Sequence, residues 1–370
     1  MKKKIISLFL LLGALILSGC TIGVGPTEEK VPVNGGIYKS TDQGNERTQS
    51  VGVTGFPRPG SLNTISILGM YFDPNDLKTI YLATEGSGLF QSHNSGEVWM
   101  QTVGLTKGVI KSLAIDPKSK CTLYAATNEN VTILKTTDCG RNWERIHYTT
   151  VPGETLTALA VPSANSNIIY AGSSLGYIYK SIDYGASWQR LNVKPLGNTI
   201  VKFLIDPRDN NIIYVPTERK GIFKTTDAGL TGWDKQLAFT CDGADTNCKN
   251  NFLPASNFVY RTLIFNPIKP HSLIYASDYG IIKTENGGEL WQTLTLLNPT
   301  GKVIIQGLAV VPDNDNELYY VTNTTFYRSV DSGKNWSTRK LPTTLPPTAL
   351  TIDPLDYKKL YLTLRIPPQK

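Results

Sequence analysis

The chain has 370 residues, of which 40% are hydrophobic and 18% charged, a balance typical of a folded globular protein rather than a disordered one. The formal net charge of +7 falls to about +4 once Lys2, Lys3 and Lys4 are set aside, and no run of Lys or Arg follows them. A groove that tracks nucleic-acid phosphates is therefore not expected.

The N-terminus combines the three lysines with the apolar stretch IISLFLLLGALIL at residues 5 to 17 and the sequence LSGC that ends at Cys20. The apolar stretch is short for a transmembrane helix. The segment resembles a bacterial lipoprotein signal, which implies cleavage before Cys20 and acylation of its thiol and new amino group, as palmitate for example. Several acyl chains together would anchor the protein to a membrane.

The alternatives to this reading are an uncleaved anchor and an ordinary secretory signal. Thr21 follows Cys20, where inner-membrane lipoproteins commonly carry aspartate, so an outer membrane is favoured if the source has two membranes. We therefore expect a signal peptide at residues 1 to 19, a tether at 20 to 35 and one folded domain at 36 to 366.

A short motif recurs along this domain, as in TTDCGRNW at residues 136 to 143 and SVDSGKNW at 329 to 336. Its acid or amide stands at seven positions: Asp42, Asn94, Asp138, Asp183, Asp227, Asn286 and Asp331. Glycine follows two positions later in every copy, and all six tryptophans belong to the set: Trp99, Trp143, Trp188, Trp233, Trp291 and Trp336. The first copy, STDQGNER, has Arg47 in the tryptophan position.

A second motif repeats in phase with the first, as an apolar run, a proline turn and a tyrosine seven or eight residues after the proline. Each copy predicts two strands, a third strand leads into the acid–glycine motif, and a fourth begins near the tryptophan. Four strands in a unit of about 45 residues is the period of a propeller blade.

The acid–glycine motif is interpreted as a structural turn between the third and fourth strands. The acid or amide is expected to bond backbone N–H groups two residues on, and the glycine to supply a positive φ. The preceding hydroxyl bonds back to the turn, and the indole packs over the hairpin. These acids are therefore predicted to be caps rather than catalytic groups.

The pattern Ser/Thr-x-Asp-x-Gly-x-x-Trp resembles the Asp-box, or bacterial neuraminidase repeat. The accompanying segments are similar to those of sortilin-type propellers, photosystem II stability-factor-like propellers and the xyloglucanase family. The resemblance covers nearly all of residues 36 to 365 and implies a β-propeller. Since this fold serves both hydrolases and binding proteins, it leaves the function open.

The phase of the repeats predicts how the propeller closes. The chain starts with a third-strand segment, GGIYKSTDQG at 35 to 44, and ends with first and second strands, LTIDPLDYKKLYLTL at 350 to 364. Together they complete one blade, which leaves no exposed sheet edge. The predicted fold is all-β, a seven-bladed propeller of four-stranded antiparallel blades with one composite blade of N- and C-terminal strands.

Each blade has two ends. The turn face carries the acid–glycine turns, and the opposite loop face carries the connections between second and third strands and between consecutive blades. The longest insertion, at 236 to 258, belongs to the loop face, where function is expected to lie. It contains Cys241 and Cys248, which predict a disulfide, and Cys121 and Cys139 predict a second one. Binding-face candidates are Phe252, Leu253, Phe258, Arg219 and Tyr279.

The sequence offers few of the residue combinations that enzyme active sites use. His93, His147 and His271 belong to three different blades, so no metal site, catalytic triad or cofactor is predicted. A sialidase needs three arginines around a carboxylate, for which Arg58, Arg219, Arg261 and Arg365 are available. A xyloglucanase-like hydrolase needs two carboxylates across a cleft, which in that family lies between two propellers, and the carboxylates available near second-strand ends are Glu85, Glu129, Glu218 and Asp278.

From sequence we therefore predict a non-catalytic, lipid-anchored propeller that serves as a binding or assembly scaffold for a protein or complex of the cell envelope. The alternative is a glycan-binding or glycan-cleaving propeller of xyloglucanase or sialidase type.

Overall fold

The computed structural model describes residues 34–54, 60–191, 195–233, 237, 259–299 and 301–367. The chain divides into two units, Met1–Val33 and Asn34–Lys370, and the fold reported below belongs to the second. The predicted signal peptide, the tether up to residue 33, Cys20, Arg58, Cys241, Cys248, Phe252, Leu253 and Phe258 all lie outside the described residues.

Strands make up almost all regular structure in the described residues. The two helical elements there are three-residue 3-10 turns, η1 (Leu62–Thr64) and η2 (Glu129–Val131). A search of these residues finds no helix with the length and apolar character needed to span a membrane.

The strands form consecutive antiparallel groups. The first group has the order β2-β1-β29-β28 and combines both ends of the unit: β2 (Thr48–Gln49), β1 (Ile37–Ser40), β29 (Leu360–Leu364) and β28 (Pro347–Ile352). The next sheet has eight strands: β5 (Ile67–Asp73), β6 (Asp76–Gly86), β7 (Leu89–Ser92), β8 (Met100–Gln101), β9 (Gly108–Ile115), β10 (Leu123–Thr127), β11 (Thr132–Thr136) and β12 (Glu144–Tyr148).

This eight-stranded sheet consists of two four-stranded halves, β5 to β8 and β9 to β12, joined where β6 pairs with β9. Two groups follow in chain order: β13 (Leu156–Ala160), β14 (Ile169–Ser173), β15 (Ile178–Ser181) and β16 (Gln189–Arg190), then β17 (Leu204–Ile205), β18 (Ile213–Pro216) and β19 (Ile222–Thr225).

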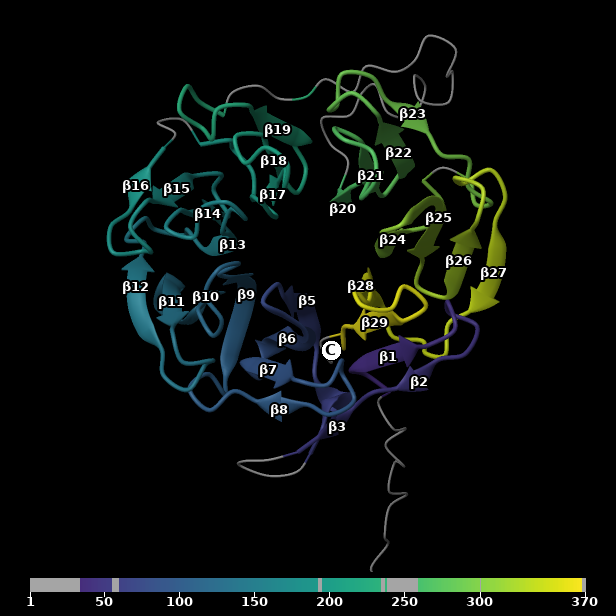
Figure 1. The fold of residues 1–370 in the computed structure, drawn as a ribbon, viewed down its shortest axis with the longest axis horizontal. Coiled ribbons are helices and arrows are strands. Elements are labelled where there is room, and N and C mark those ends of the chain that lie inside the picture. Colours follow the sequence, from purple (N-terminus) through teal and green to yellow (C-terminus); the bar gives the residue numbers. More distant parts are fainter. Residues whose placement is uncertain are drawn as a thin grey trace, which may run out of the picture. The chain divides into compact units, whose positions relative to one another are not determined.

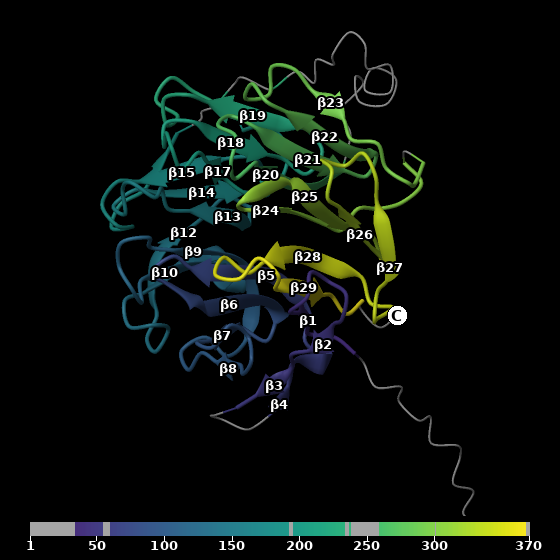
Figure 2. The same cartoon turned by 45° about the vertical axis from the view of Figure 1, so that its right-hand side comes forward.

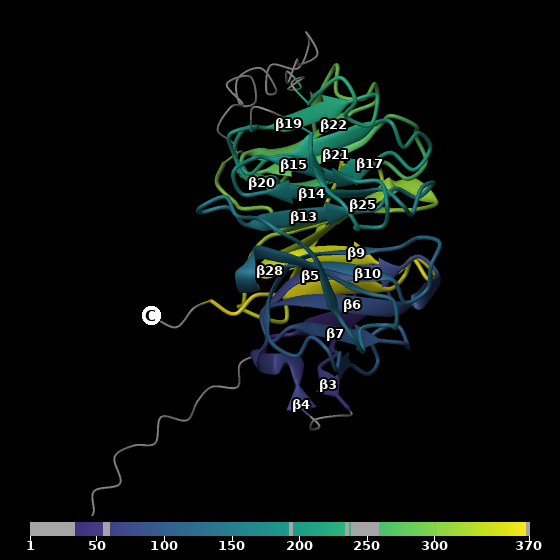
Figure 3. The same ribbon diagram turned by 90° about the vertical axis from the view of Figure 1, so that its left-hand side faces the viewer.

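The last two groups are four-stranded: β20 (Tyr260–Phe265), β21 (Leu273–Ser277), β22 (Gly280–Thr284) and β23 (Gln292–Thr293), then β24 (Gly307–Val311), β25 (Asn314–Val321), β26 (Thr325–Ser329) and β27 (Ser337–Lys340). A short additional pair, β3 (Gly52–Val53) and β4 (Gly60–Ser61), lies at the edge of the ring (Figure 3).

Within this unit the groups follow one another around a ring. The strand nearest the centre is the one that begins each blade, namely β5, β9, β13, β17, β20, β24 and β28 (Figure 1). Buried clusters bridge neighbouring groups, as where Tyr214 and Ile222 pack with Leu263 and Leu273. The described residues form seven such clusters, one for each junction around the ring. The predicted all-β propeller of antiparallel blades is confirmed, and the strand groups agree with the seven-blade count.

The composite blade closes the ring as the sequence predicts. Strand β1 lies beside β29, with Tyr38 opposite Leu362 and Lys39 opposite Tyr361 (Figure 2). The Leu364 amide also donates to the Gly36 carbonyl at 3.1 Å. Paired strands from the two ends hold the ring without a covalent link.

The acid–glycine turns share one hydrogen-bond pattern. In all seven, the Ser or Thr hydroxyl donates to the acid or amide oxygen at 2.7 to 2.8 Å and accepts from the glycine N–H at 2.7 to 3.1 Å. The acid or amide instead accepts from the backbone N–H four residues on, as Asp138 does from Asn142 at 2.9 Å. The expected bond two residues on is therefore wrong as a general rule, because the hydroxyl has taken the glycine N–H.

The residue between acid and glycine also has a positive φ in every copy, from 54° at Ser95 to 71° at Gly287. Its N–H donates to a carbonyl in the proline turn of its own blade, as Ala228 does to Asn211 at 2.9 Å. At Ser95, Tyr184, Ala228 and Gly287 the carbonyl faces the neighbouring blade. We call this residue the linking residue; the set is Gln43, Ser95, Cys139, Tyr184, Ala228, Gly287 and Ser332.

The motif tyrosine and a lysine on the adjacent third strand reach this carbonyl from the neighbouring blade. Tyr170 and Lys180 stand opposite each other in the sheet, and both donate to the Ala228 carbonyl, at 3.1 and 3.4 Å. The same arrangement joins Tyr214 and Lys224 to Gly287 and Tyr361 and Lys39 to Ser95, while Lys135 donates alone to Tyr184. Blade-to-blade contact is therefore polar at the turn face and apolar beneath it.

Removing the tyrosine hydroxyl should cost stability only where it makes this bond. Tyr170→Phe is expected to lower the free energy of unfolding by about 1 kcal/mol, because it leaves the Ala228 carbonyl less satisfied. Tyr124→Phe is the matched control, since the buried Tyr124 hydroxyl has no hydrogen-bond partner among the described residues. Urea denaturation measures both variants, and equal losses would contradict the role given to the linking residue.

The capping acids should make folding sensitive to acid. Hydrogen bonds from the residue four positions on hold the pKa of Asp138, Asp183, Asp227 and Asp331 at about 2. Because these values lie below that of an unfolded chain, about 3.9, their contribution is present above pH ~4 and is lost as the pH falls towards 2.

Replacing all four acids with asparagine should reduce the fall in melting temperature between pH 5 and pH 2.5. Asn94 and Asn286 already serve as caps, so the turn tolerates an amide. Thermal melts across this pH range test the prediction, and an unchanged pH profile in the variant would refute it.

Candidate functional site

The loop face carries the four carboxylates that the sequence singled out. Glu85 lies at the end of β6, Glu129 between β10 and β11, Glu218 after β18 and Asp278 after β21. All four thus follow second strands, as predicted. The structure brings the first two to one place, and the other two to a second place further along the chain.

Glu85 and Glu129 meet at the joint between the second and third blades. Pairing of β6 with β9 places Glu85 opposite Val109 and Gly86 opposite Gly108. Glu129 reaches the same point, because a Cβ added to Gly108 would lie 2.9 Å from its Oε1. Gly108 has a φ of 90°, so a side chain there would be strained as well as crowded. Glu129 therefore contacts Gly108 of its own blade, and the strand that pairs with Gly108 carries Glu85 one residue away from that pairing.

Arg365 orients one carboxylate of this pair. Its Nε donates to Glu85 Oε2 at 2.9 Å, and its Nη2 forms a close ion pair with Oε1. The residue next to it, Ile366, donates its N–H to Ser66 Oγ at 3.0 Å. Arg365 and Ile366 therefore reach from the composite blade to the second blade, and Arg365 holds the Glu85 carboxylate in a fixed geometry.

The second place lies between the fifth and sixth blades. Asp278 accepts from the Val259 amide at 3.1 Å, and Glu218 accepts through its backbone carbonyl from the Tyr260 amide at 2.9 Å. Arg261 is close enough that Asp278 opposes the lowering of its pKa by burial. Asp278 therefore supports loop structure through its carboxylate, whereas Glu218 does so through its backbone.

The arginines of the loop face also lie at separate places. Arg365 binds Glu85, whereas Arg219 and Arg261 lie at the fifth and sixth blades. The Arg219 amide donates to Asn198 Oδ1 at 2.9 Å. The described arginines therefore do not form the three-arginine clamp that a sialidase needs.

The histidines lie in three different blades. His93 shares a 3.0 Å hydrogen bond with Thr79, and His271 lies 3.9 Å from Asp206. His147 packs between the rings of Trp188 and Tyr179, and burial lowers its pKa. Within the part of the chain that the structure describes, no group of three or more His, Cys, Asp or Glu side chains is arranged to hold a metal ion.

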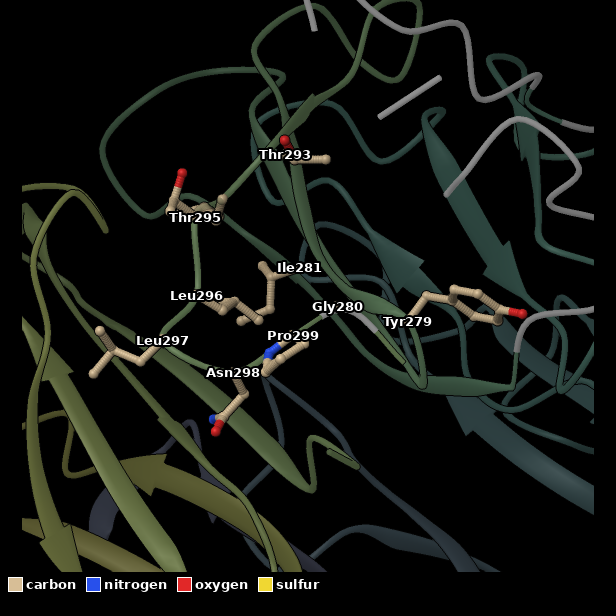
Figure 4. Close-up of a pocket in the computed structure, with 10 residues that line it drawn as sticks. Tyr279, Gly280, Ile281, Thr293, Thr295, Leu296, Leu297, Asn298 and Pro299 are labelled. Atoms are coloured by element: carbon tan, nitrogen blue, oxygen red, sulfur yellow. The ribbon is translucent and has the colours of Figure 1, made fainter. Parts of the chain in front are cut away.

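Tyr279 lines a pocket of about 320 Å³ on the loop face of the sixth blade. Figure 4 shows the Tyr279 ring and the Leu297 side chain at opposite ends of this pocket, with Ile281, Leu296 and Pro299 between them. Tyr279 is 40% exposed and Leu297 58%, so both present apolar surface to solvent. The sequence predicted Tyr279 as a binding residue but missed Leu297 and Pro299, whose only signal is their place in the connection between blades.

The structure also contains a disulfide between Cys121 and Cys139 on the turn face. Cys139 is a linking residue, and its amide donates to the Cys121 carbonyl at 3.1 Å. The bridge therefore reinforces a hydrogen bond that the other blades make without one.

Comparison with known proteins gives partial matches to enzymes. No protein-family profile matches the chain. A xyloglucanase of Paenibacillus sp. is 27% identical over 155 residues, covering 36% of this chain and 15% of that enzyme. A xyloglucanase of Hypocrea jecorina (strain QM6a) is 28% identical over 168 residues, covering 39% of this chain and 19% of that enzyme. The chain thus spans less than a fifth of the length of these relatives.

Solved structures show the same fold over most of the chain. The GH74 xyloglucanase of Xanthomonas campestris superposes with a TM-score of 0.61 at 19% identity, covering 81% of this chain and 51% of that one. The GH74 enzyme of Niastella koreensis gives a TM-score of 0.64 at 17% identity, with the same coverage. YCF48 bound to the D1 peptide gives 0.59 at 16% identity, covering 82% of this chain and 94% of that one. At these identities the likeness shows the propeller fold alone.

These comparisons correct the functional prediction. The expectation of a non-catalytic scaffold for an envelope protein is wrong, because both sequence relatives are xyloglucanases. The error arose because the repeats fix the blades, whereas the chemistry resides in loops outside the repeat.

Proposed function

We propose that the loop face binds and cleaves a plant-type β-glucan such as xyloglucan, with Glu85 and Glu129 as the catalytic carboxylate pair. The observation that carries the proposal is the pairing of β6 with β9, which brings the strand end that carries Glu85 next to Gly108, the glycine that Glu129 contacts. Glycosidic bonds are hydrolysed by two carboxyl groups, one protonating the leaving oxygen and one acting as base or nucleophile. Partial similarity to xyloglucanases supports this substrate class.

The two carboxylates have different surroundings, which suits different roles. Glu85 is held by two hydrogen bonds from Arg365, an arrangement suited to an ionised base or nucleophile with a fixed direction. Glu129 is exposed and forms no ion pair among the described residues, so it is the better placed to exchange a proton with the leaving group.

Tyr279 is proposed as a second contact for the same polymer. Aromatic rings bind sugar rings through their apolar faces, and Tyr279, Leu297 and Pro299 provide such a surface. The pocket belongs to the sixth blade, whereas the carboxylates belong to the second and third. A polysaccharide lying across the loop face would contact both places, which a single sugar would not.

The proposal predicts release of reducing ends from xyloglucan by the purified protein. Glu85→Gln and Glu129→Gln should each reduce this rate by about 100-fold or more, since each removes one partner of the acid–base pair. Glu97→Gln is the matched control, because Glu97 also forms an ion pair, with Lys39, but on the turn face.

Binding is measured separately by affinity electrophoresis in gels containing xyloglucan. Tyr279→Ala should reduce retardation while leaving the melting temperature close to that of the native protein. The proposal fails if native protein neither is retarded by xyloglucan nor releases reducing ends, or if the Glu85 and Glu129 variants remain fully active.

Export and lipid anchoring are proposed for the same protein on the basis of LSGC at residues 17 to 20. An anchored hydrolase would act on glycans outside the cytoplasm. The change Cys20→Ser should abolish incorporation of labelled palmitate and release the protein from membranes. Unchanged labelling of this variant would exclude Cys20 as the site of acylation.

A further inference from the structure

The turn that carries Glu129 has an unusual backbone conformation. Val131, the last residue of η2, has a φ of 47°. A positive φ is strained at a residue that branches at Cβ, far more than at glycine or asparagine. The other non-glycine residues with a positive φ in the described part of the chain lie in the acid–glycine turns or the proline turns, and none of them is β-branched. Strain of this kind persists only where the surrounding structure imposes it, and it is common at functional sites.

Hydrogen bonds hold both ends of η2. The Glu129 carbonyl accepts from the Thr132 hydroxyl at 2.7 Å and from the Thr127 hydroxyl at 3.3 Å. The Val131 carbonyl accepts from the Thr149 amide at 3.3 Å. Thr149 belongs to the connection that leads from β12 to β13 of the next blade. The conformation of η2 therefore depends on a segment outside its own hairpin.

Glu154 anchors this connection from within the protein. Its side chain is buried, with 2% exposed. Both carboxylate oxygens accept from the Tyr179 hydroxyl, at 3.1 and 3.0 Å, and Oε2 also forms a close hydrogen bond with the Thr149 hydroxyl. Thr149 is thus bound to Glu154 through its side chain and to Val131 through its amide. One carboxylate in this way links β15 of the fourth blade to the turn that carries Glu129.

A buried carboxylate is costly unless hydrogen bonds or an opposite charge compensate it. Among the described residues, no Lys or Arg side chain forms an ion pair with Glu154. Its compensation therefore comes from the two hydroxyl donors. Burial and the adjacent Glu154 charge raise the pKa of Tyr179 to about 12, so this hydroxyl keeps its proton and donates at neutral pH. The donors fix the position of the carboxylate as well as stabilising it.

We propose that Glu154 is a positioning residue that orients η2, and with it Glu129, for the reaction on the loop face. The inference rests on the proposed function, because it assigns Glu154 a part in the same site. Glu154 holds Thr149, the Thr149 amide holds Val131 in its strained conformation, and Val131 fixes the direction of the turn from which the Glu129 side chain projects. Glu154 itself is buried and acts only through these residues.

Steady-state kinetics on xyloglucan test this role. Glu154→Ala should lower kcat by about tenfold and leave KM within about twofold, because a misplaced catalytic group affects the transition state more than substrate binding. Glu154→Gln keeps an oxygen that accepts hydrogen bonds, so it should retain most of the native kcat. Glu317→Ala is the matched control, since Glu317 is also buried and also accepts from a tyrosine hydroxyl, that of Tyr319, but lies in the last continuous blade.

Amide hydrogen exchange measured by mass spectrometry reports on the turn without requiring activity. In Glu154→Ala the amides of residues 128 to 132 should exchange about tenfold faster, while those of β20 to β22 keep their native rates. Tyr179→Phe removes a single hydroxyl and should change kcat and exchange in the same direction. It decides the question if Glu154→Ala does not fold.

The outcomes separate this role from the proposed function. A native protein that releases no reducing ends from xyloglucan overturns the proposed function and the role of Glu154 with it. If the native protein is active, the positioning role alone is overturned by a native kcat in Glu154→Ala and Tyr179→Phe, by unchanged exchange at residues 128 to 132, or by an equal loss of kcat in Glu317→Ala.

Discussion

Neighbouring blades share one backbone-carbonyl contact at four junctions of the described ring, through the carbonyls of Ser95, Tyr184, Ala228 and Gly287. The linking residue has a positive φ, which the acid, hydroxyl and glycine of its turn hold in place. Its N–H is bound within its own blade, and at these four junctions its carbonyl accepts from a tyrosine or lysine of the neighbouring blade, as Ala228 does. The side chain of the linking residue makes no such bond, which explains why Ser, Cys, Tyr, Ala and Gly are all found there. Gln43 is the exception, because its side chain accepts from Arg328.

Because the acids of the turns serve as caps, the turn face and the loop face differ in chemistry. Acid oxygens on the turn face are occupied by hydroxyl and backbone donors, so they are not available for catalysis. On the loop face, hydroxyls at second-strand ends such as Thr84, Thr217 and Thr322 also bond within their own loops. The charged residues of the described loops, however, vary from blade to blade. The loops that carry Glu85 and Glu129 are brought together there by a local departure, the pairing of β6 with β9, which joins two blades into one sheet.

Much of the fold could be predicted from sequence because it depends on periodic, local features. The spacing of proline, tyrosine and glycine gave the strands, and the split repeat gave the pairing of β1 with β29. The partner of each tyrosine hydroxyl could not be predicted, because Tyr170 and Ala228 are 58 residues apart and their contact depends on how blades pack. The sequence shows Arg47 in place of the motif tryptophan, but its stacking on Phe326 depends on how two blades pack.

The candidate site was predictable only as a set of residues. Sequence placed Glu85, Glu129, Glu218 and Asp278 at strand ends, but it did not distinguish the first two, because their meeting depends on a junction outside the repeat. The functional prediction failed for the same reason, since blade repeats are shared by binding proteins and hydrolases.

The central claim is that the loop face, at Glu85 and Glu129, recognises a β-glucan chain. A crystal structure of the Glu129→Gln variant with a xyloglucan oligosaccharide tests this most directly. The account predicts a glycosidic bond positioned over Gly108, within hydrogen-bond distance of Glu85 or of the substituted residue 129. An oligosaccharide bound on the turn face, or at a place on the loop face remote from Gly108, would contradict it.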